Sequence, residues 1–265
     1  MSDHEPAPRT PLAEGADDHE VAAWAAAEAG HLLLQVRQQG LEGRALKDAG
    51  DLAAHELLMR LLGEVRPGDA VLSEEGKDDR LRLQADRVWI VDPLDGTREF
   101  SEPPRDDWAV HVALWERSGD GGELTAGAVA LPGLDQTFHT GRPPVVPDSS
   151  ASRPRLVVSR TRPPEFVKAL AEEIDAELVP MGSAGAKAMS VIRDVSDAYV
   201  HAGGQYEWDS AAPVAVARAA GLFTSRVDGT PLVYNQDDVL LPDLIICRPE
   251  LSEQILAFVR EHGTD

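Results

Sequence analysis

Apolar side chains recur every three or four residues in two stretches near the start of the chain, as in helices with one buried face. The first stretch follows adjacent aspartates at positions 17 and 18, either of which can cap a helix, and it ends near Gly40. The second runs from about Asp51 to Val65, and Pro67 stops it. The pattern predicts two helices, with Asp51 at the start of the second.

Short apolar runs follow the two helices and predict strands. In the first half of the chain they cover residues 70–73, 87–91, 108–115 and 124–131, with a hairpin turn at 119–122. In the second half, strand-like runs at 155–159, 177–181, 197–201 and 244–247 alternate with helical stretches at 163–174, 184–195, 208–221 and from about 249. The order predicts an α+β first half and an α/β second half, which together form a layered sandwich.

Residues 141–154 separate these two patterns and are rich in proline and serine, so they predict a linker with a boundary near residue 150. We expect an N-terminal α+β lobe over residues 18–150 and a C-terminal α/β lobe over residues 151–265. Residues 1–17 are polar and contain proline, so we expect a disordered tail there.

The 25 basic and 46 acidic side chains of this 265-residue chain give a net charge of −21. Such a charge opposes binding to polymeric nucleic acid or to an anionic membrane surface. No uncharged apolar stretch approaches the roughly 20 residues that span a bilayer, so we expect no membrane span. The single cysteine, Cys247, lies in an apolar run and is interpreted as buried. We therefore expect a cytoplasmic protein.

The segment Trp89-Ile-Val-Asp-Pro-Leu-Asp-Gly-Thr97 ends an apolar strand in two aspartates three positions apart. An aspartate that emerges from such a strand is costly to desolvate unless it is paired or binds a metal. Pro93 stiffens the turn so that Asp92 and Asp95 converge, with the Leu94 carbonyl between them. Hard cations such as Mg²⁺ prefer these oxygens, so the turn predicts a metal site. An Asp-Gly turn would explain Asp95 alone.

Two further acids lie at the edges of predicted elements. Glu74 follows the strand at residues 70–73, and Asp209 lies at the start of the helix at residues 208–221. Taken singly, each is more often a solvated charge or a helix cap, and Asp209 would cap its helix well. Only the combination of four acids suggests a shared site.

Three motifs resemble the signature motifs of the inositol monophosphatase superfamily, in the same order and spacing. They are Leu72-Ser-Glu-Glu75, the Trp89 to Thr97 segment and Trp208-Asp209, and the similarity spans about residues 18 to 260. The resemblance implies a layered α-β-α-β-α sandwich of the inositol monophosphatase and fructose-1,6-bisphosphatase type, and it suggests a homodimer. Within the superfamily, Asp-Gly-Thr-Arg-Glu-Phe100 and Val158-Ser-Arg160 resemble bacterial 3′(2′),5′-bisphosphate nucleotidases of the CysQ type.

The resemblance also implies roles for individual residues. Two or three Mg²⁺ ions would be bound, with Asp92 as the bridging ligand, by Glu74, Asp92, the Leu94 carbonyl, Asp95 and Asp209. Glu74, Thr97 and an upstream aspartate would be catalytic, the last two by polarising the attacking water. That aspartate should be Asp51. Asp48 is the alternative, because the chain has Lys47-Asp-Ala-Gly-Asp51 where family members usually show a threonine.

The resemblance and the residues together give a candidate substrate site, comprising Leu94, Asp95, Gly96, Thr97, Arg160, Ser183, Lys187 and Asp209. The segment from Gly182 to Lys187 has two open interpretations. Its amides and lysine hold a substrate phosphate at a helix start, or it is a cap with a solvated lysine. In the first case Lys187 and Arg160 would bind the distal phosphate of a bisphosphorylated nucleotide. His111 lies in a strand-like run and is interpreted as a core or wall residue.

These inferences lead to a Mg²⁺-dependent phosphatase that converts adenosine 3′,5′-bisphosphate to AMP and phosphate in sulfur assimilation. Its second expected substrate is 3′-phosphoadenylyl sulfate, and the resemblance implies inhibition by lithium. One alternative is an inositol-1-phosphate or fructose-1,6-bisphosphate phosphatase of the same fold. Another, from a different class, is a non-catalytic metal-binding regulatory protein. The sequence contains neither a P-loop nor a Gly-x-Ser-x-Gly motif, which argues against a P-loop kinase and an α/β-hydrolase.

Overall fold

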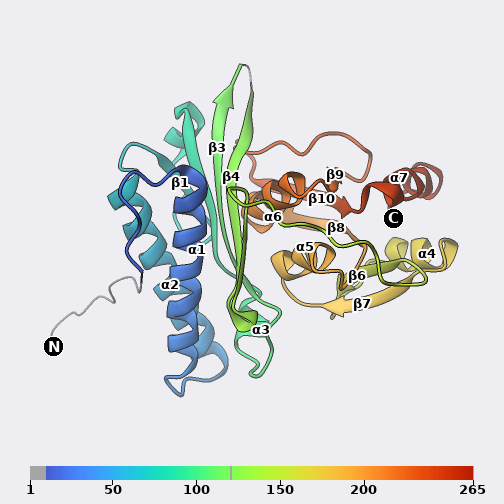
Figure 1. The fold of residues 1–265 in the computed structure, drawn as a ribbon, viewed down its shortest axis with the longest axis horizontal. Helices are drawn as coiled ribbons and strands as arrows, with labels where there is room; N and C mark the ends of the chain where they lie inside the picture. Colours follow the sequence, from blue (N-terminus) through green and yellow to red (C-terminus); the bar gives the residue numbers. More distant parts are fainter. Residues whose placement is uncertain (1–9, 120, 265) are drawn as a thin grey trace.

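The computed structural model describes residues 10–119 and 121–264, which form two five-stranded sheets between layers of helices (Figure 1). The helices are α1 (Asp18–Arg37), α2 (Gly43–Val65), α3 (Thr97–Phe100), α4 (Glu165–Glu173), α5 (Ala184–Ile192), α6 (Glu207–Ala219) and α7 (Pro249–His262). The strands of the first sheet are β1 (Ala70–Ser73), β2 (Arg87–Asp95), β3 (Ala109–Ser118), β4 (Gly121–Leu131) and β5 (Gln136–His139). Those of the second are β6 (Arg155–Ser159), β7 (Glu177–Met181), β8 (Ala198–Tyr206), β9 (Phe223–Ser225) and β10 (Leu240–Cys247).

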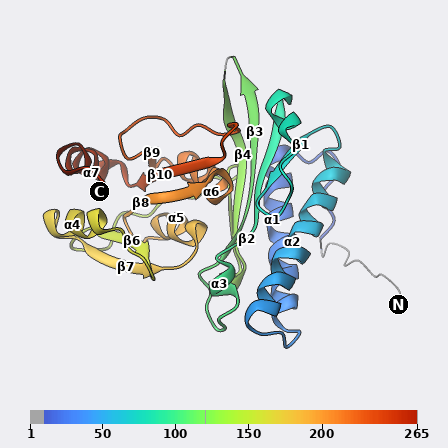
Figure 2. The ribbon, with the colours of Figure 1, turned by 180° about the vertical axis from the view of Figure 1, so that it is seen from behind.

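The helices α1 and α2 cover the face of the first sheet that points away from the second sheet (Figure 2). Asp17 caps α1, because its carboxylate accepts a hydrogen bond from the Glu20 backbone N at 2.9 Å. The apolar face of α1 is buried, with Val21, Ala25 and Leu33 inaccessible to solvent. This packing confirms the helical spacing expected for α1.

The helices α5 and α6 lie between the two sheets, and their apolar side chains share one core with both of them. The helices α4 and α7 cover the outer face of the second sheet, where they form a separate core. The chain is therefore layered as helices, sheet, helices, sheet and helices. This confirms the predicted α-β-α-β-α sandwich.

Some elements differ from their predicted bounds. The helix α2 begins at Gly43, so Asp51 lies inside it and the prediction that Asp51 starts this helix was wrong. The short strands β5 and β9 were not predicted. The predicted boundary near residue 150 falls between the strands of the two sheets, and the independence of the two lobes stays a prediction.

The predicted tail falls partly outside the described residues, because the structure begins at residue 10. Residues 10–17 include contacts with the rest of the fold. The Thr10 backbone N donates to Glu28 Oε1 at 3.1 Å, and the Thr10 carbonyl accepts from Trp24 Nε1 at 2.7 Å. These contacts attach Thr10 to α1, and the disorder of the tail stays a prediction. Among the described residues, none of the helices is both long enough and apolar enough to cross a bilayer.

Candidate metal centre

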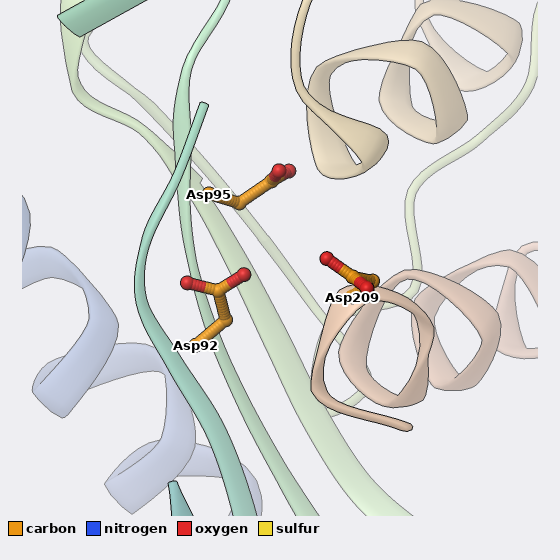
Figure 3. A group of neighbouring side chains, drawn as sticks. All are labelled: Asp92, Asp95 and Asp209. Atoms are coloured by element: carbon orange, nitrogen blue, oxygen red, sulfur yellow. The ribbon is translucent and has the colours of Figure 1, made fainter. Parts of the chain in front are cut away.

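Asp92 and Asp95 lie at the end of β2, both almost completely buried. Residues three apart on a regular strand point to opposite faces of the sheet. Here the pairing of β2 with β3 shifts register between the two aspartates, which is the local irregularity of a β-bulge. Asp92 Oδ1 also accepts a hydrogen bond from the Leu94 backbone N at 3.0 Å. The predicted turn thus brings both carboxylates to one side (Figure 3).

Asp209, on α6, completes a group of three carboxylates. It is the third residue of α6, and its Oδ2 accepts a hydrogen bond from the Tyr206 backbone N at 2.7 Å. One carboxylate oxygen from each of Asp92, Asp95 and Asp209 lies within 4.8 Å of the others. Figure 3 shows how the three side chains face one another. The predicted convergence of these three acids is present in the fold.

Glu74 is the fourth acid that was predicted for the site. It follows β1 directly, and its backbone N donates to the Val91 carbonyl of the neighbouring β2 at 3.3 Å. Its carboxyl group is in hydrogen-bond contact with that of Asp92. Glu74 is not part of the group of three within 4.8 Å. Asp92 therefore interacts both with Glu74 and with the other two aspartates.

The pKa values show how unfavourable this concentration of carboxylates is without a cation. Burial raises the pKa of Asp92 well above its usual range, and the charges of Glu74, Asp95 and Asp209 raise it further. Burial likewise raises the pKa of Glu74 to about 7 and that of Asp209 to about 6. A bound cation removes this repulsion. Because every donor is a carboxylate or carbonyl oxygen, the residues fit a hard cation.

Asp95 differs from its neighbours because the start of α5 holds it. Its Oδ1 accepts from the Ala184 backbone N at 3.1 Å, and its Oδ2 accepts from the Gly185 backbone N at 2.6 Å and from the Ser183 hydroxyl. His111 Nε2 lies 3.3 Å from the same Oδ2. Burial alone would raise the pKa of Asp95, but the contacts with His111 and Ser183 lower it to about 2.

His111 connects the two sides of the site, a role that the sequence did not indicate. Its ring is fully buried, as expected of a core residue. Its Nδ1 lies 3.0 Å from the Trp208 carbonyl and must donate to it, while its Nε2 faces Asp95. A polar residue inside an otherwise apolar strand was the available signal.

The start of α5 does not present its amides to solvent, because Asp95 occupies them. Lys187 is also buried, and its Nζ donates to the Gly182 carbonyl at 3.2 Å and lies 5.2 Å from the centre of the Tyr199 ring. The interpretation of this segment as a cap with a solvated lysine therefore needs correction, since Lys187 is not a solvated side chain. A distal-phosphate contact of Lys187 stays a prediction without an exposed ammonium to support it.

Arg160 is engaged by acids of the first lobe. Its Nη2 lies 2.7 Å from Glu99 Oε1 and 3.2 Å from Glu102 Oε2. The guanidinium is about a quarter exposed, with an exposed fraction of 28%. The structure thus does not leave Arg160 unpaired for a substrate phosphate, and its predicted contact also stays a prediction.

The side chains of Thr97, on α3, and Asp51, on α2, lie close together. Thr97 Oγ1 lies 3.4 Å from Asp51 Oδ1 and 3.2 Å from the Leu94 carbonyl, and it follows Gly96, whose φ of 84° suits glycine. Asp48, the other candidate, is exposed and pairs with Arg44 at 3.5 Å. The geometry therefore pairs Asp51, and not Asp48, with Thr97.

Comparison with known proteins agrees with this geometry. A protein-family model described as the inositol monophosphatase family matches residues 17–264. The chain belongs to the inositol monophosphatase family. This confirms the resemblance on which the metal ligands were assigned, and proteins of this family depend on metal ions.

Among curated relatives, a 3′-phosphoadenosine 5′-phosphate phosphatase of Mycobacterium bovis is 52% identical over 240 residues, which cover 88% of this chain and 90% of that protein. The 3′(2′),5′-bisphosphate nucleotidase CysQ of Escherichia coli K12 is 31% identical over 73% of this chain and 81% of its own length. Among solved structures, CysQ of Bacteroides thetaiotaomicron matches with a TM-score of 0.75 and 27% identity, covering 87% of this chain and 97% of the other.

Proposed function

We propose that this protein is a Mg²⁺-dependent phosphatase that hydrolyses the 3′-phosphate of adenosine 3′,5′-bisphosphate to give AMP and inorganic phosphate. The relatives named for this activity support the substrate, since one of them is 52% identical over most of both chains. The acid set of the site supports the chemistry. The observation that carries the proposal is the convergence of Asp92, Asp95 and Asp209, whose carboxylate oxygens lie within 4.8 Å of one another.

These oxygen donors would hold the cations. Glu74, Asp92, the Leu94 carbonyl, Asp95 and Asp209 would be the ligands, and Asp92, whose pKa responds to Glu74, Asp95 and Asp209, would be the ligand that two cations share. When bound, Mg²⁺ would lower the pKa of a water molecule, orient it in line with the phosphorus and neutralise charge on the phosphate oxygens. A protein of charge −21 has no other evident means to admit a polyanion.

The protein groups nearest to the attacking water would be Thr97 and Asp51. The Thr97 hydroxyl donates to Asp51 Oδ1 at 3.4 Å, which leaves the lone pairs of Thr97 Oγ1 free to accept a hydrogen bond from the water. Burial and the charge of Glu75 raise the pKa of Asp51 to about 7, while Thr97 lowers it. A carboxylate with such a pKa can take up a proton near neutral pH.

The reaction needs no covalent intermediate. The water oxygen forms a bond to phosphorus as the bond from phosphorus to the 3′-oxygen breaks, and the 3′-oxygen ends as the hydroxyl of AMP. Hydrolysis of 3′-phosphoadenylyl sulfate at the same ester would follow the same course. The number of Mg²⁺ ions, lithium inhibition, the homodimer and a cytoplasmic location stay predictions.

A kinetic comparison of three substrates tests the proposal. We expect kcat/KM for adenosine 3′,5′-bisphosphate to exceed that for inositol 1-phosphate and for fructose 1,6-bisphosphate, with phosphate release lost in a chelator and restored by Mg²⁺. A preference for either of the other two esters would favour the alternative substrates. No release from any substrate by the folded, Mg²⁺-supplied protein would favour the non-catalytic alternative.

A further inference from the structure

An aromatic pair lies at the junction of β8 and α6, next to the metal centre. The rings of Tyr206 and Trp208 are stacked, with centroids 4.8 Å apart and planes inclined by 13°. Trp208 is half-buried and packs against the core between the two sheets. Tyr206 is 47% exposed, which is unusual for a large aromatic side chain in this protein. The pair thus places one ring on the core and the other ring towards solvent.

The backbone fixes this pair to the metal ligand Asp209. Trp208 directly precedes Asp209, and the Tyr206 backbone N donates to Asp209 Oδ2 at 2.7 Å. Across the sheet, Tyr206 is paired in register with Leu240 of β10, whose side chain is also exposed. Tyr206 therefore lies three residues before Asp209, the proposed metal ligand. Its backbone is held both by the Asp209 carboxylate and by the pairing with β10.

Two basic side chains, Lys187 and Arg160, were predicted to bind the nucleotide, and neither of them is both exposed and unpaired. Lys187 is buried against Gly182 and Tyr199, and Arg160 pairs with Glu99. Uncharged surface is therefore a further candidate for recognition of the leaving group. A nucleobase offers such surface, because each base has an aromatic face that stacks on aromatic side chains.

We infer that Tyr206, stacked on Trp208, is the platform on which the adenine base of the substrate packs. This inference rests on the proposed function and extends it to the residue that distinguishes a nucleotide from a phosphate ester without a base. Because Trp208 already holds the Tyr206 ring, little side-chain freedom is lost when the base binds.

The test measures the affinity for AMP by calorimetry with Mg²⁺ present, with ribose 5-phosphate as the ligand that lacks the base. Stacking of one base on an aromatic side chain predicts a roughly 5- to 150-fold weaker affinity of Tyr206→Ala for AMP. Tyr206→Phe should bind AMP like the wild type, and the affinity for ribose 5-phosphate should not differ among the three proteins. Val145→Ala, at an 89% exposed apolar residue of the linker, is the matched control.

The kinetic readout follows the same logic. Tyr206→Ala should lower kcat/KM for adenosine 3′,5′-bisphosphate by a similar factor, mainly through KM, and leave that for inositol 1-phosphate unchanged. Unchanged affinity for AMP in Tyr206→Ala, or equal losses for AMP and ribose 5-phosphate, would overturn the inference. The proposed function fails separately, if the wild type itself shows no preference for the nucleotide.

Discussion

Asp48 and Asp51 lie three residues apart in the same helix, yet their surroundings give them different chemistry. Asp48 is exposed and its partner, Arg44, is 92% exposed, so this pair contributes little. Asp51 is half-buried and faces Thr97. The difference follows from the direction in which each side chain leaves α2, because only Asp51 points towards the turn after β2.

We expect Thr97→Ala and Asp51→Asn each to lower kcat by roughly 10²- to 10⁴-fold with little change in KM, since both act on the attacking water. The double variant should be only slightly worse than either single variant, because groups that act as a unit are not additive. The measurement is a double-mutant cycle of kcat. Asp48→Asn is the control and should keep normal activity, whereas multiplicative losses would argue against a shared role.

The buried position of Lys187 leads to a prediction that differs from the one drawn from sequence. Its ammonium lies near the charges of Asp95 and Asp209, and burial lowers its pKa. We expect Lys187→Met, which keeps the length of the side chain, to reduce kcat/KM by a similar factor for adenosine 3′,5′-bisphosphate and inositol 1-phosphate. A loss confined to the nucleotide would instead support the distal-phosphate contact.

The three aspartates of the site could be predicted because each occurs in a short motif with a physical reason for its position. The contacts of Asp95 could not, since its partners Ser183 and Gly185 are 88 and 90 residues away in the chain. His111 was missed for the same reason. Its two partners come from β2 and α6, and only the assembled layers bring them together.

At the level of elements, the helix starts determine where the functional groups lie. The helix α2 begins at Gly43 without a side-chain cap, so no capping residue marks its start in the sequence. Gly50, next to Asp51, lies inside the helix. An added Cβ there would come within 2.9 Å of Leu94 and 2.7 Å of Phe100. This glycine lets α2 approach the turn after β2, which brings Asp51 to Thr97.

At the start of α5, Gly185 likewise has no room for a larger side chain. A Cβ added there would lie 2.1 Å from His111 Nε2, and both groups hold Asp95. We expect Gly185→Ala to destabilise the protein by about 1–3 kcal/mol through overpacking and to lower activity by displacing Asp95. Thermal unfolding and phosphate release measure the two effects.

Gly63→Ala in α2 is the matched control for this substitution. An added Cβ at Gly63 would meet no atom within 4 Å, so alanine should stabilise the helix by roughly 0.5–1 kcal/mol. Normal activity and stability in Gly185→Ala would show that His111 and the α5 start are not held as tightly as the structure indicates.

Across the whole molecule, a network of ion pairs joins the linker to the second lobe. Asp197, at the start of β8, accepts from Arg155 Nε at 3.0 Å and from Arg248 Nε at 2.9 Å. Its Oδ1 also accepts from Ser149 Oγ of the linker at 2.8 Å. Asp194 contacts the same two arginines. Because Asp197 is buried, its loss removes one of the two carboxylates that both guanidinium groups share and leaves only Asp194.

This network predicts the response of stability to acid. Burial raises the pKa of Asp197, but Arg155 and Ser149 lower it on balance, and hydrogen bonds from Ser150 and Arg155 lower that of Asp194 to about 2. A lowered folded-state pKa stabilises the fold above the ordinary value of 3.8, and this contribution is lost as pH falls towards 2. We expect Asp197→Asn to cost about 1.5–3 kcal/mol at pH 7.

Denaturant unfolding at several pH values measures this effect. The difference between wild type and Asp197→Asn should shrink as the pH falls below the ordinary aspartate value of 3.8. The control is Asp175→Asn, which removes a surface pair with Arg153 at 3.8 Å and should cost less than about 1 kcal/mol. A difference that is independent of pH would contradict the assigned titration.

The most direct test of the central claim is the hydrolysis of adenosine 3′,5′-bisphosphate by Asp92→Asn across a titration of Mg²⁺. Asparagine keeps the shape of the side chain but removes the charge that two cations would share. The account predicts a fall in kcat/KM of on the order of 10³-fold or more that added Mg²⁺ does not restore, in a protein whose circular dichroism is unchanged. Near-normal turnover by the folded variant would contradict the assignment of Asp92 as the shared ligand and, with it, the proposed mechanism.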